Sequence, residues 1–254
     1  MSFVDSIVEQ VLRIELGIHH SCVRLLCRTD DEALHDMRIG LRRLRSLLRP
    51  IRNLDSVREL DAAAAEVGRL TTPIRDLEVM IIELQRQGLP DLAQPRRQRL
   101  EQGYRMVEDS PTMRRLMACL DDWPESFRDA QRAGELRALR DFIRKRLKKQ
   151  RDLLVAALQD PAYDRHALRI LIKRMRYAHE AYPSLSPISP KAAASLKAVQ
   201  GALGDWHDHF QWCLKVDAER DLEPLRRPWE IAMDASLKAA EAELQNLLER
   251  LQAH

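Results

Sequence analysis

Residues 35–45 of the chain read HDMRIGLRRLR, and residues 166–176 read HALRILIKRMR. The second stretch keeps the histidine, a cation wherever the first has an arginine, and most of the apolar positions. The two histidines lie 131 residues apart, which is about half of the 254-residue chain. A repeat at this spacing predicts that the chain consists of two homologous halves.

Both copies separate charged from apolar side chains when they are plotted as helices. At about 100° per residue, the histidine and most arginines of the first copy fall between about 280° and 360°, and its apolar side chains between about 120° and 240°. The second copy has the same two faces. The basic stripe of each copy is the set of cations and histidine on its polar face: His35, Arg38, Arg42, Arg45 and Arg49 in the first copy, and His166, Arg169, Lys173 and Arg176 in the second.

The composition favours helices throughout the chain. Leu, Ala, Arg and Glu are abundant, no strand or hairpin signal appears, and 45% hydrophobic residues are enough for a core. We predict an all-α fold in which two homologous antiparallel helical bundles pack as one domain around a basic cavity. The domain covers residues 1–254, with halves of about 1–128 and 129–254.

Turn and capping signals divide the chain into expected helices. Thr71-Thr72-Pro73 and Gly204 are expected to separate neighbouring helices, and Trp123-Pro124 to end one. The expected helices are about 5–28, 33–53, 56–70, 73–87, 91–107, 111–123, 134–158, 164–182, 191–203, 205–220 and 228–251.

A third group of cations lies in the expected helix 134–158, on one face within about 80°. Like charges three or four residues apart cost a few tenths of a kcal/mol per pair, whereas solvated helices usually alternate acids and bases. Because the net charge is only +3, this clustering indicates a local anion site. Arg13 joins the group because it corresponds to Arg144 at the offset of the repeat. The group contains Arg13, Arg137, Arg140, Arg144 and Lys148.

Ion pairs with acidic side chains on neighbouring helices are the alternative explanation for these cations, because charge runs are usually solvated faces. The chain has 39 Asp and Glu residues that could serve as partners. The same pattern in both halves favours a polyanion instead, since the planar guanidinium of arginine suits phosphate oxygens.

The histidines lack the spacing of a metal site. Cations occupy the positions after His35 and His166 where further ligands would be needed. His207 and His209 point to different sides of a helix, as do the neighbours His19 and His20. We therefore expect no resident metal and no cofactor.

The sequence contains no glycine-rich phosphate loop, HExxH motif or nucleophile elbow. Asp76 and Asp208 correspond between the halves, and two interpretations of them stay open. They could hold Mg²⁺ or act as acid and base, or each could hold an arginine in place through an ion pair. We expect no enzymatic activity and name no catalytic residue.

No apolar run reaches the length of a membrane-spanning helix, and Met1–Asp5 does not begin a signal peptide. We expect a cytoplasmic protein without a membrane partner. Aromatic residues make up 5% of the chain and do not interleave with the stripes, which counts against binding of single-stranded nucleic acid.

The two motif copies, together with residues 75–79 (RDLEV) and 197–208 (KAVQGALGDWHD), resemble the CHAD family, the conserved histidine α-helical domain. Its hallmark is a histidine followed by Arg or Lys at this spacing, in two copies. The resemblance implies two four-helix bundles around a basic cavity, binding of inorganic polyphosphate, and association with polyphosphate granules. It also implies that the stripes line that cavity, and Lys197 matches a lysine of the family pattern.

We therefore predict a non-enzymatic protein that binds inorganic polyphosphate. A linear polyanion suits charges that run along helices. A nucleic-acid-binding protein and a metal-assisted phosphatase or polyphosphate hydrolase are the competing classes. The sequence leaves the oligomeric state open.

Overall fold

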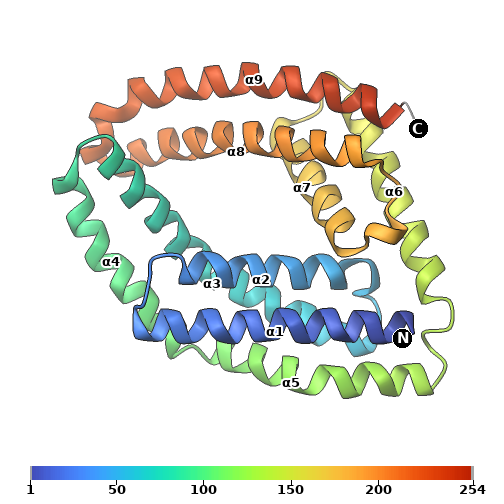
Figure 1. Ribbon diagram of the computed structural model, residues 1–254. Coiled ribbons are helices and arrows are strands. Elements are labelled where there is room, and N and C mark those ends of the chain that lie inside the picture. The colour runs from blue at the N-terminus through green and yellow to red at the C-terminus, as the bar shows by residue number, and fades with distance from the viewer. Residues whose placement is uncertain (1, 253–254) are drawn as a thin grey trace. The chain divides into compact units, whose positions relative to one another are not determined.

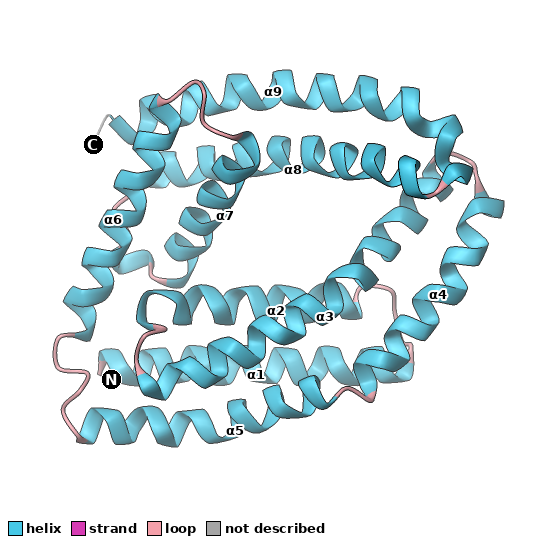
Figure 2. Cartoon of the chain, turned by 180° about the vertical axis from the view of Figure 1, so that it is seen from behind, coloured by secondary structure: helices cyan, strands magenta, loops and turns pink. Residues whose placement is uncertain are grey.

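The computed structural model describes residues 2–252, and within this range the chain is helical and contains no strand (Figures 1 and 2). The prediction of an all-α fold is confirmed. The chain divides into two compact units, an N-terminal unit that ends at Leu139 and a C-terminal unit that begins at Arg140. In the described part of the chain, no helix combines the length and the apolar character needed to cross a membrane.

The N-terminal unit is a bundle in which α3 packs against α2, α4 and α5, while α1 packs against α2, α4 and α5. Figure 1 shows α1 and α2 lying side by side. A 3₁₀ turn, Arg49–Ile51, follows α2. The helices of this unit are α1 (Phe3–Cys27), α2 (Ala33–Leu48), α3 (Asp55–Arg86), α4 (Pro90–Glu108) and α5 (Pro111–Arg132).

The apolar face predicted for the first motif copy is the face that α2 buries. Met37 and Leu44 are 0% exposed and Leu41 is 3% exposed. Burial of one such side chain stabilises the fold by about 1.5–3 kcal/mol. The basic stripe therefore has its orientation fixed by the core on the opposite side of the same helix. Helix α2 ends at Leu48, so Pro50 shortens the expected helix 33–53, as its position inside that helix predicts, because proline cannot continue the hydrogen-bond ladder.

The C-terminal unit has one apolar core to which all four of its α-helices contribute. Leu154 comes from α6, Ile172 and Met175 from α7, Leu196 from α8 and Leu247 from α9. Helices α8 and α9 run side by side in both ribbon views. The bounds are α6 (Leu139–Gln159), α7 (Arg165–Ala181), α8 (Pro190–Ala218) and α9 (Arg226–Gln252), with 3₁₀ turns at Pro183–Leu185 and Arg220–Leu225.

Three predicted helix breaks are wrong, because packing overrides the local signals. Helix α3 continues through Pro73, where the Thr71 and Thr72 hydroxyls donate to the carbonyls of Val67 and Gly68, both at 2.8 Å. Helix α5 passes through Pro124, and α8 passes through Gly204. In the last two cases a side chain beside the break is buried: Trp123 in α5 and Leu203 in α8.

The predicted start of the long basic helix at Gly134 is also wrong. Gly134 has a φ of +83° and ends α5, because its N–H donates to Gln131 and the N–H of Glu135 donates to Ala130. Helix α6 begins only at Leu139. Arg137 therefore lies in the turn between the helices and does not share a helix face with the other cations of its group.

Two predicted N-caps are confirmed. The Asp164 carboxylate accepts from the N–H of Ala167 at 2.7 Å, so α7 and its basic stripe begin where the sequence indicates. The Ser110 hydroxyl accepts from the N–H of Thr112 at 3.1 Å at the start of α5.

Candidate functional site

Arg38 on α2 is bound to the middle of α3. Its Nη1 donates to the Gly68 carbonyl at 3.1 Å, to the Thr71 hydroxyl at 2.7 Å and to the Thr72 hydroxyl at 3.3 Å. These acceptors lie just before Pro73, whose ring and missing N–H loosen this turn of the helix. All three contacts use Nη1, and a guanidinium also carries donors on Nε and Nη2 that suit an anion.

Positive charge is concentrated around Arg38 where α2 faces α3. Burial lowers the pKa of His35, and the charges of Arg75 and Arg42 lower it further. Burial also lowers the pKa of Arg38; Asp76 opposes this shift, whereas Arg42 and Arg75 add to it. The N-terminal unit therefore holds three arginines and one histidine close enough to repel one another. Asp76 and Glu78 act as counter-charges on Arg38, and Glu32 and Asp36 act as counter-charges on His35.

Arg75 is a cation that the predicted site did not include. Its Nη1 donates to Glu78 Oε2 at 2.7 Å, and the other carboxylate oxygen of Glu78 accepts from the Tyr104 hydroxyl at 2.6 Å. Glu78 is buried, so this pair of contacts fixes the direction of the Arg75 side chain. The signal that could have revealed Arg75 is its correspondence with His207 in the other half.

Arg45 lies further along α2 and forms an ion pair with Asp61 of α3, with 3.6 Å between Nε and Oδ1. This contact fits the alternative explanation, in which the cations form ion pairs with acidic side chains on neighbouring helices. Arg49 falls in the 3₁₀ turn that follows α2 rather than on the helix itself. The N-terminal part of the stripe, from His35 to Arg42, is therefore the part where cations gather.

In the C-terminal unit, cations and histidines gather between α7 and α8. The rings of His166 and His207 lie 5.0 Å apart between centroids. Burial lowers the pKa of His207 to about 4, with the charges of Arg169, His166 and Lys173 as further causes. Burial also lowers the pKa of Arg169, against which Asp208 acts as the counter-charge.

The last predicted cations of this half have different surroundings. Arg176 forms an ion pair with Glu180 at 2.9 Å and lies over the ring of Tyr177 at 5.2 Å from its centroid. Lys197, near the start of α8, is exposed. The stripe residues that cluster in the C-terminal unit are therefore His166, Arg169 and Lys173.

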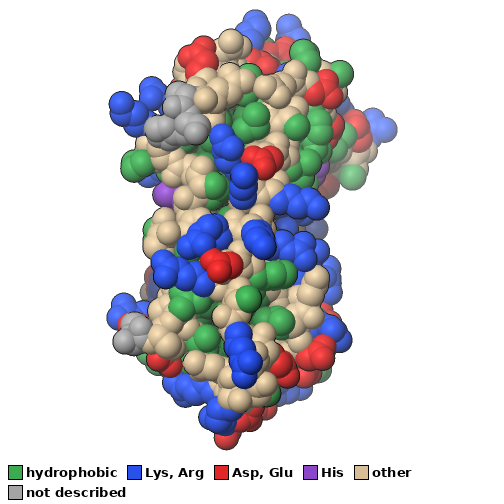
Figure 3. Space-filling model, turned by 90° about the vertical axis from the view of Figure 1, so that its right-hand side faces the viewer, with side chains coloured by type: hydrophobic (Ala, Val, Ile, Leu, Met, Phe, Trp, Pro, Cys, Tyr) green, Lys and Arg blue, Asp and Glu red, His purple; other side chains and the backbone are tan. Residues whose placement is uncertain are grey.

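The predicted cations on α6, namely Arg140, Arg144 and Lys148, are exposed. Figure 3 shows Lys and Arg side chains gathering on the face of the molecule that includes this helix. Arg140 and Lys148 are exposed members of the predicted group, whereas Arg144 forms an ion pair with Asp141 one turn earlier. Arg13 pairs with Glu9 at 2.6 Å and is 76% exposed. Such exposed pairs contribute little to stability, about 0–1 kcal/mol.

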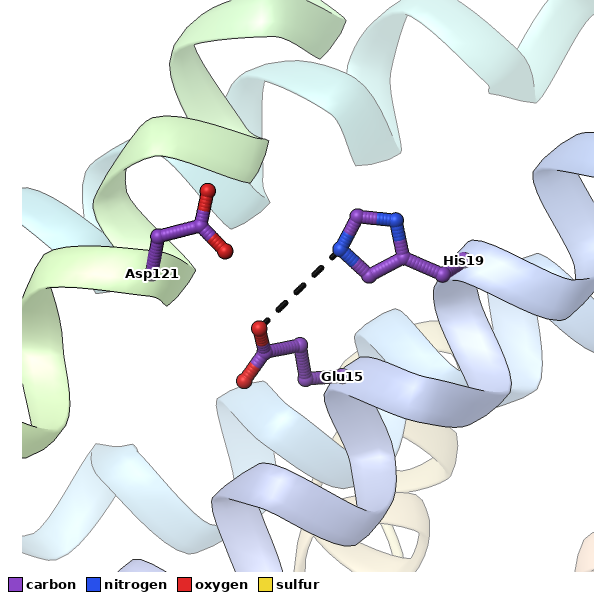
Figure 4. A group of neighbouring side chains, drawn as sticks. All are labelled: Glu15, His19 and Asp121. Atoms are coloured by element: carbon purple, nitrogen blue, oxygen red, sulfur yellow. Dashed lines mark ion pairs between the residues drawn. The ribbon is translucent and has the colours of Figure 1, made fainter.

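Within residues 2–252, one group has the residue types and spacing to hold a metal ion: Glu15, His19 and Asp121 (Figure 4). One potential ligand atom from each residue lies within 4.8 Å of the others. Burial raises the pKa of Glu15, and the neighbouring Asp121 raises it further. The distance between His19 Nε2 and Glu15 Oε1 is 4.0 Å. His19 and Asp121 are exposed, and an ion pair between Glu15 and His19 accounts for the geometry.

A comparison with protein-family models matches residues 18–214 to the CHAD domain. The match includes both motif copies and the facing segments around Asp76 and Asp208. The chain belongs to the CHAD family.

A solved CHAD structure has the same fold as this CHAD chain. The crystal structure of the CHAD domain from the plant Ricinus communis matches it with a TM-score of 0.72 and 22% sequence identity, over 100% of this chain and 92% of that chain. Among curated proteins, none matches the sequence closely enough to count as a relative.

In this CHAD chain, Asp76 and Asp208 have matching surroundings. Each lies on the third helix of its unit, and each carboxylate charge acts on the first arginine of the neighbouring basic stripe, Arg38 or Arg169. Of the two interpretations that the sequence left open, these surroundings favour a carboxylate that holds an arginine in place.

Proposed function

We propose that this protein binds inorganic polyphosphate through the basic stripes of α2 and α7. The CHAD family is associated with polyphosphate binding. The observation that carries the proposal is the clustering of partly buried cations around Arg38 in one unit and around Arg169 in the other. Cations that are both desolvated and close together are costly, and a bound polyanion offsets that cost.

A linear polyanion fits these stripes because their charges run along a helix. Arg38 and Arg45 are two turns apart on α2, which is about 10 Å along the helix axis. Phosphates spaced along one extended chain can contact successive turns. A compact anion such as a single nucleotide would occupy only part of such a stripe.

The proposal includes the prediction from the sequence that the basic stripes of both units bind the same polyphosphate chain. It also includes association with polyphosphate granules, since a protein that binds long polyphosphate accumulates where the polymer does. We propose that binding is not coupled to catalysis. The residues of the stripes support this part of the proposal, because they are cations without a recognisable nucleophile or metal-ligand spacing.

Competition binding at fixed salt tests the proposal against nucleic acids. We expect long-chain polyphosphate to displace a labelled polyphosphate probe at much lower phosphate concentration than single-stranded RNA or duplex DNA does. Equal displacement by RNA or DNA would instead support a nucleic-acid-binding protein. Release of inorganic phosphate from polyphosphate in the presence of Mg²⁺ would support a hydrolase.

A further inference from the structure

The two units differ at one position beside their basic stripes. Arg75 in the N-terminal unit, which is always charged, corresponds to His207 in the C-terminal unit. Arg75 is held by Glu78 at 2.7 Å. His207 instead lies against a second histidine, His166, at 5.0 Å between ring centroids. One half therefore has a permanent cation where the other has a titratable group.

One ring nitrogen of His207 has an unused capacity to form a hydrogen bond. Its Nδ1 is buried and makes no hydrogen bond within the described residues. A buried polar atom without a partner is uncommon and costs free energy. This buried nitrogen lies close to Arg169 and Lys173, two of the cations that are proposed to bind the ligand.

Burial, together with the neighbouring charges, keeps His207 neutral while the ligand is absent. From α7, Arg169, His166 and Lys173 all disfavour its protonated form, in addition to burial. From its own helix, α8, Asp208 contributes a negative charge that acts on Arg169. A polyanion that contacts Arg169 and Lys173 would neutralise this repulsion and favour the protonated ring.

We propose that binding of a polyanion to the C-terminal unit is coupled to the uptake of a proton by His207. This inference rests on the proposed function and adds a pH dependence to the same site. The proton that His207 takes from solvent makes the ring a cation and a donor on both nitrogens, so that it becomes the counterpart of Arg75.

The coupling predicts the direction of the pH effect. His207 is neutral in the free protein above about pH 4, and bound phosphate raises its pKa. Between these two pKa values binding consumes a proton, so affinity rises as the pH falls, by at most about tenfold per pH unit for one proton. The N-terminal unit has no such dependence at the position of Arg75, because an arginine keeps its proton throughout.

Isothermal titration calorimetry with long-chain polyphosphate tests the coupling. Titrations at pH 6 in two buffers of different ionisation enthalpy give the number of protons exchanged on binding. We expect net proton uptake by the wild-type protein and clearly less by the His207→Gln variant. His20→Gln is the matched control, because His20 is an exposed histidine of the N-terminal unit, and its uptake should equal that of the wild type.

Equal proton uptake by the wild type and a folded His207→Gln variant would overturn the coupling, as would binding without net uptake by the wild type. Both results would leave polyphosphate binding itself intact. A complete absence of binding between pH 5 and 8 would instead contradict the proposed function. The His207→Arg variant gives a second check, since we expect it to bind with a weaker pH dependence than the wild type.

Discussion

The guanidinium of Arg38 is held in place by the hydroxyl of Thr71, which accepts from Arg38 at 2.7 Å and donates to the Val67 carbonyl at 2.8 Å. We expect Thr71→Val to lower the free energy of unfolding by about 1 kcal/mol, because a buried hydroxyl loses both contacts. We also expect it to weaken polyphosphate binding by about two- to tenfold, because Arg38 loses its support. Urea denaturation and a binding titration measure the two effects.

Thr72→Val is the matched control for this prediction. Its hydroxyl is exposed and lies further from Arg38, at 3.3 Å, so the loss in both measurements should be smaller. An equal or larger loss from Thr72→Val would show that Thr71 has no special part in holding Arg38.

Glu78 links α3 to α4 through a buried carboxylate that contacts Arg75 and Tyr104. We expect Glu78→Gln to lower the free energy of unfolding by about 1–3 kcal/mol, because Arg75 loses its charged partner while the amide still accepts from Tyr104. Tyr104→Phe removes only the hydroxyl contact and should cost less. Urea denaturation curves of the two variants compare these costs directly, and a greater loss in Tyr104→Phe would contradict this account.

Stability without ligand should depend on pH through His207. Because its pKa is lowered to about 4 from an ordinary value of 6.5, the unfolded chain binds more protons than the folded chain between these values. The free energy of unfolding should therefore fall as the pH falls from 6.5 to 4. Urea denaturation across this range should show a smaller fall in His207→Gln, and an identical fall would contradict the lowered pKa.

At the scale of elements, the end of α5 depends on Gly134. A Cβ at this position would lie 3.1 Å from Arg137 Nε, and the φ of +83° is itself unfavourable for alanine. We expect Gly134→Ala to lower the free energy of unfolding by about 1 kcal/mol or more. Gly88→Ala is the control, since Gly88 also has positive φ, +72°, but open space around it. Thermal unfolding of both variants separates the cost of crowding from the cost of the backbone conformation. Equal losses of stability would show that crowding against Arg137 adds no cost.

The elements also show which sequence signals are strong. The apolar face of α2 and the caps at Ser110 and Asp164 were predictable, because periodicity and capping act locally. The continuity of α3 through Pro73 and of α8 through Gly204 was not, because it depends on burial against helices distant in the sequence. The early end of α2 follows from Pro50 alone.

The candidate site was predictable only where its residues share one helix. His35, Arg38, Arg42, His166, Arg169 and Lys173 stand in one helical pattern, so the sequence groups them. Arg75 and His207 belong to the neighbouring helices, and only the packing of α3 and α8 brings them to the stripes. The ion pairs of Arg45 and Arg176 likewise depend on where Asp61 and Glu180 lie.

At the scale of the whole molecule, we propose that the basic stripes of both units bind the same polyphosphate chain. Arg42 and Lys173 occupy corresponding positions in the two copies of the motif. Removing either charge should weaken binding of the same polyphosphate chain. Stability should change little, because each removal relieves repulsion between like charges. The double variant Arg58→Ala with Arg227→Ala is the matched control, since it also removes one exposed arginine from each unit, outside the stripes.

The most direct test is the affinity of the double variant Arg42→Ala with Lys173→Ala for long-chain polyphosphate as a function of salt concentration. We expect weaker binding than in either single variant, and a salt dependence flattened by about one counterion for each cation removed. The Arg58 and Arg227 control should keep both the affinity and the slope close to those of the wild type. Wild-type affinity in a double variant whose helical circular dichroism is unchanged would contradict the account and leave the stripes as ordinary solvated faces.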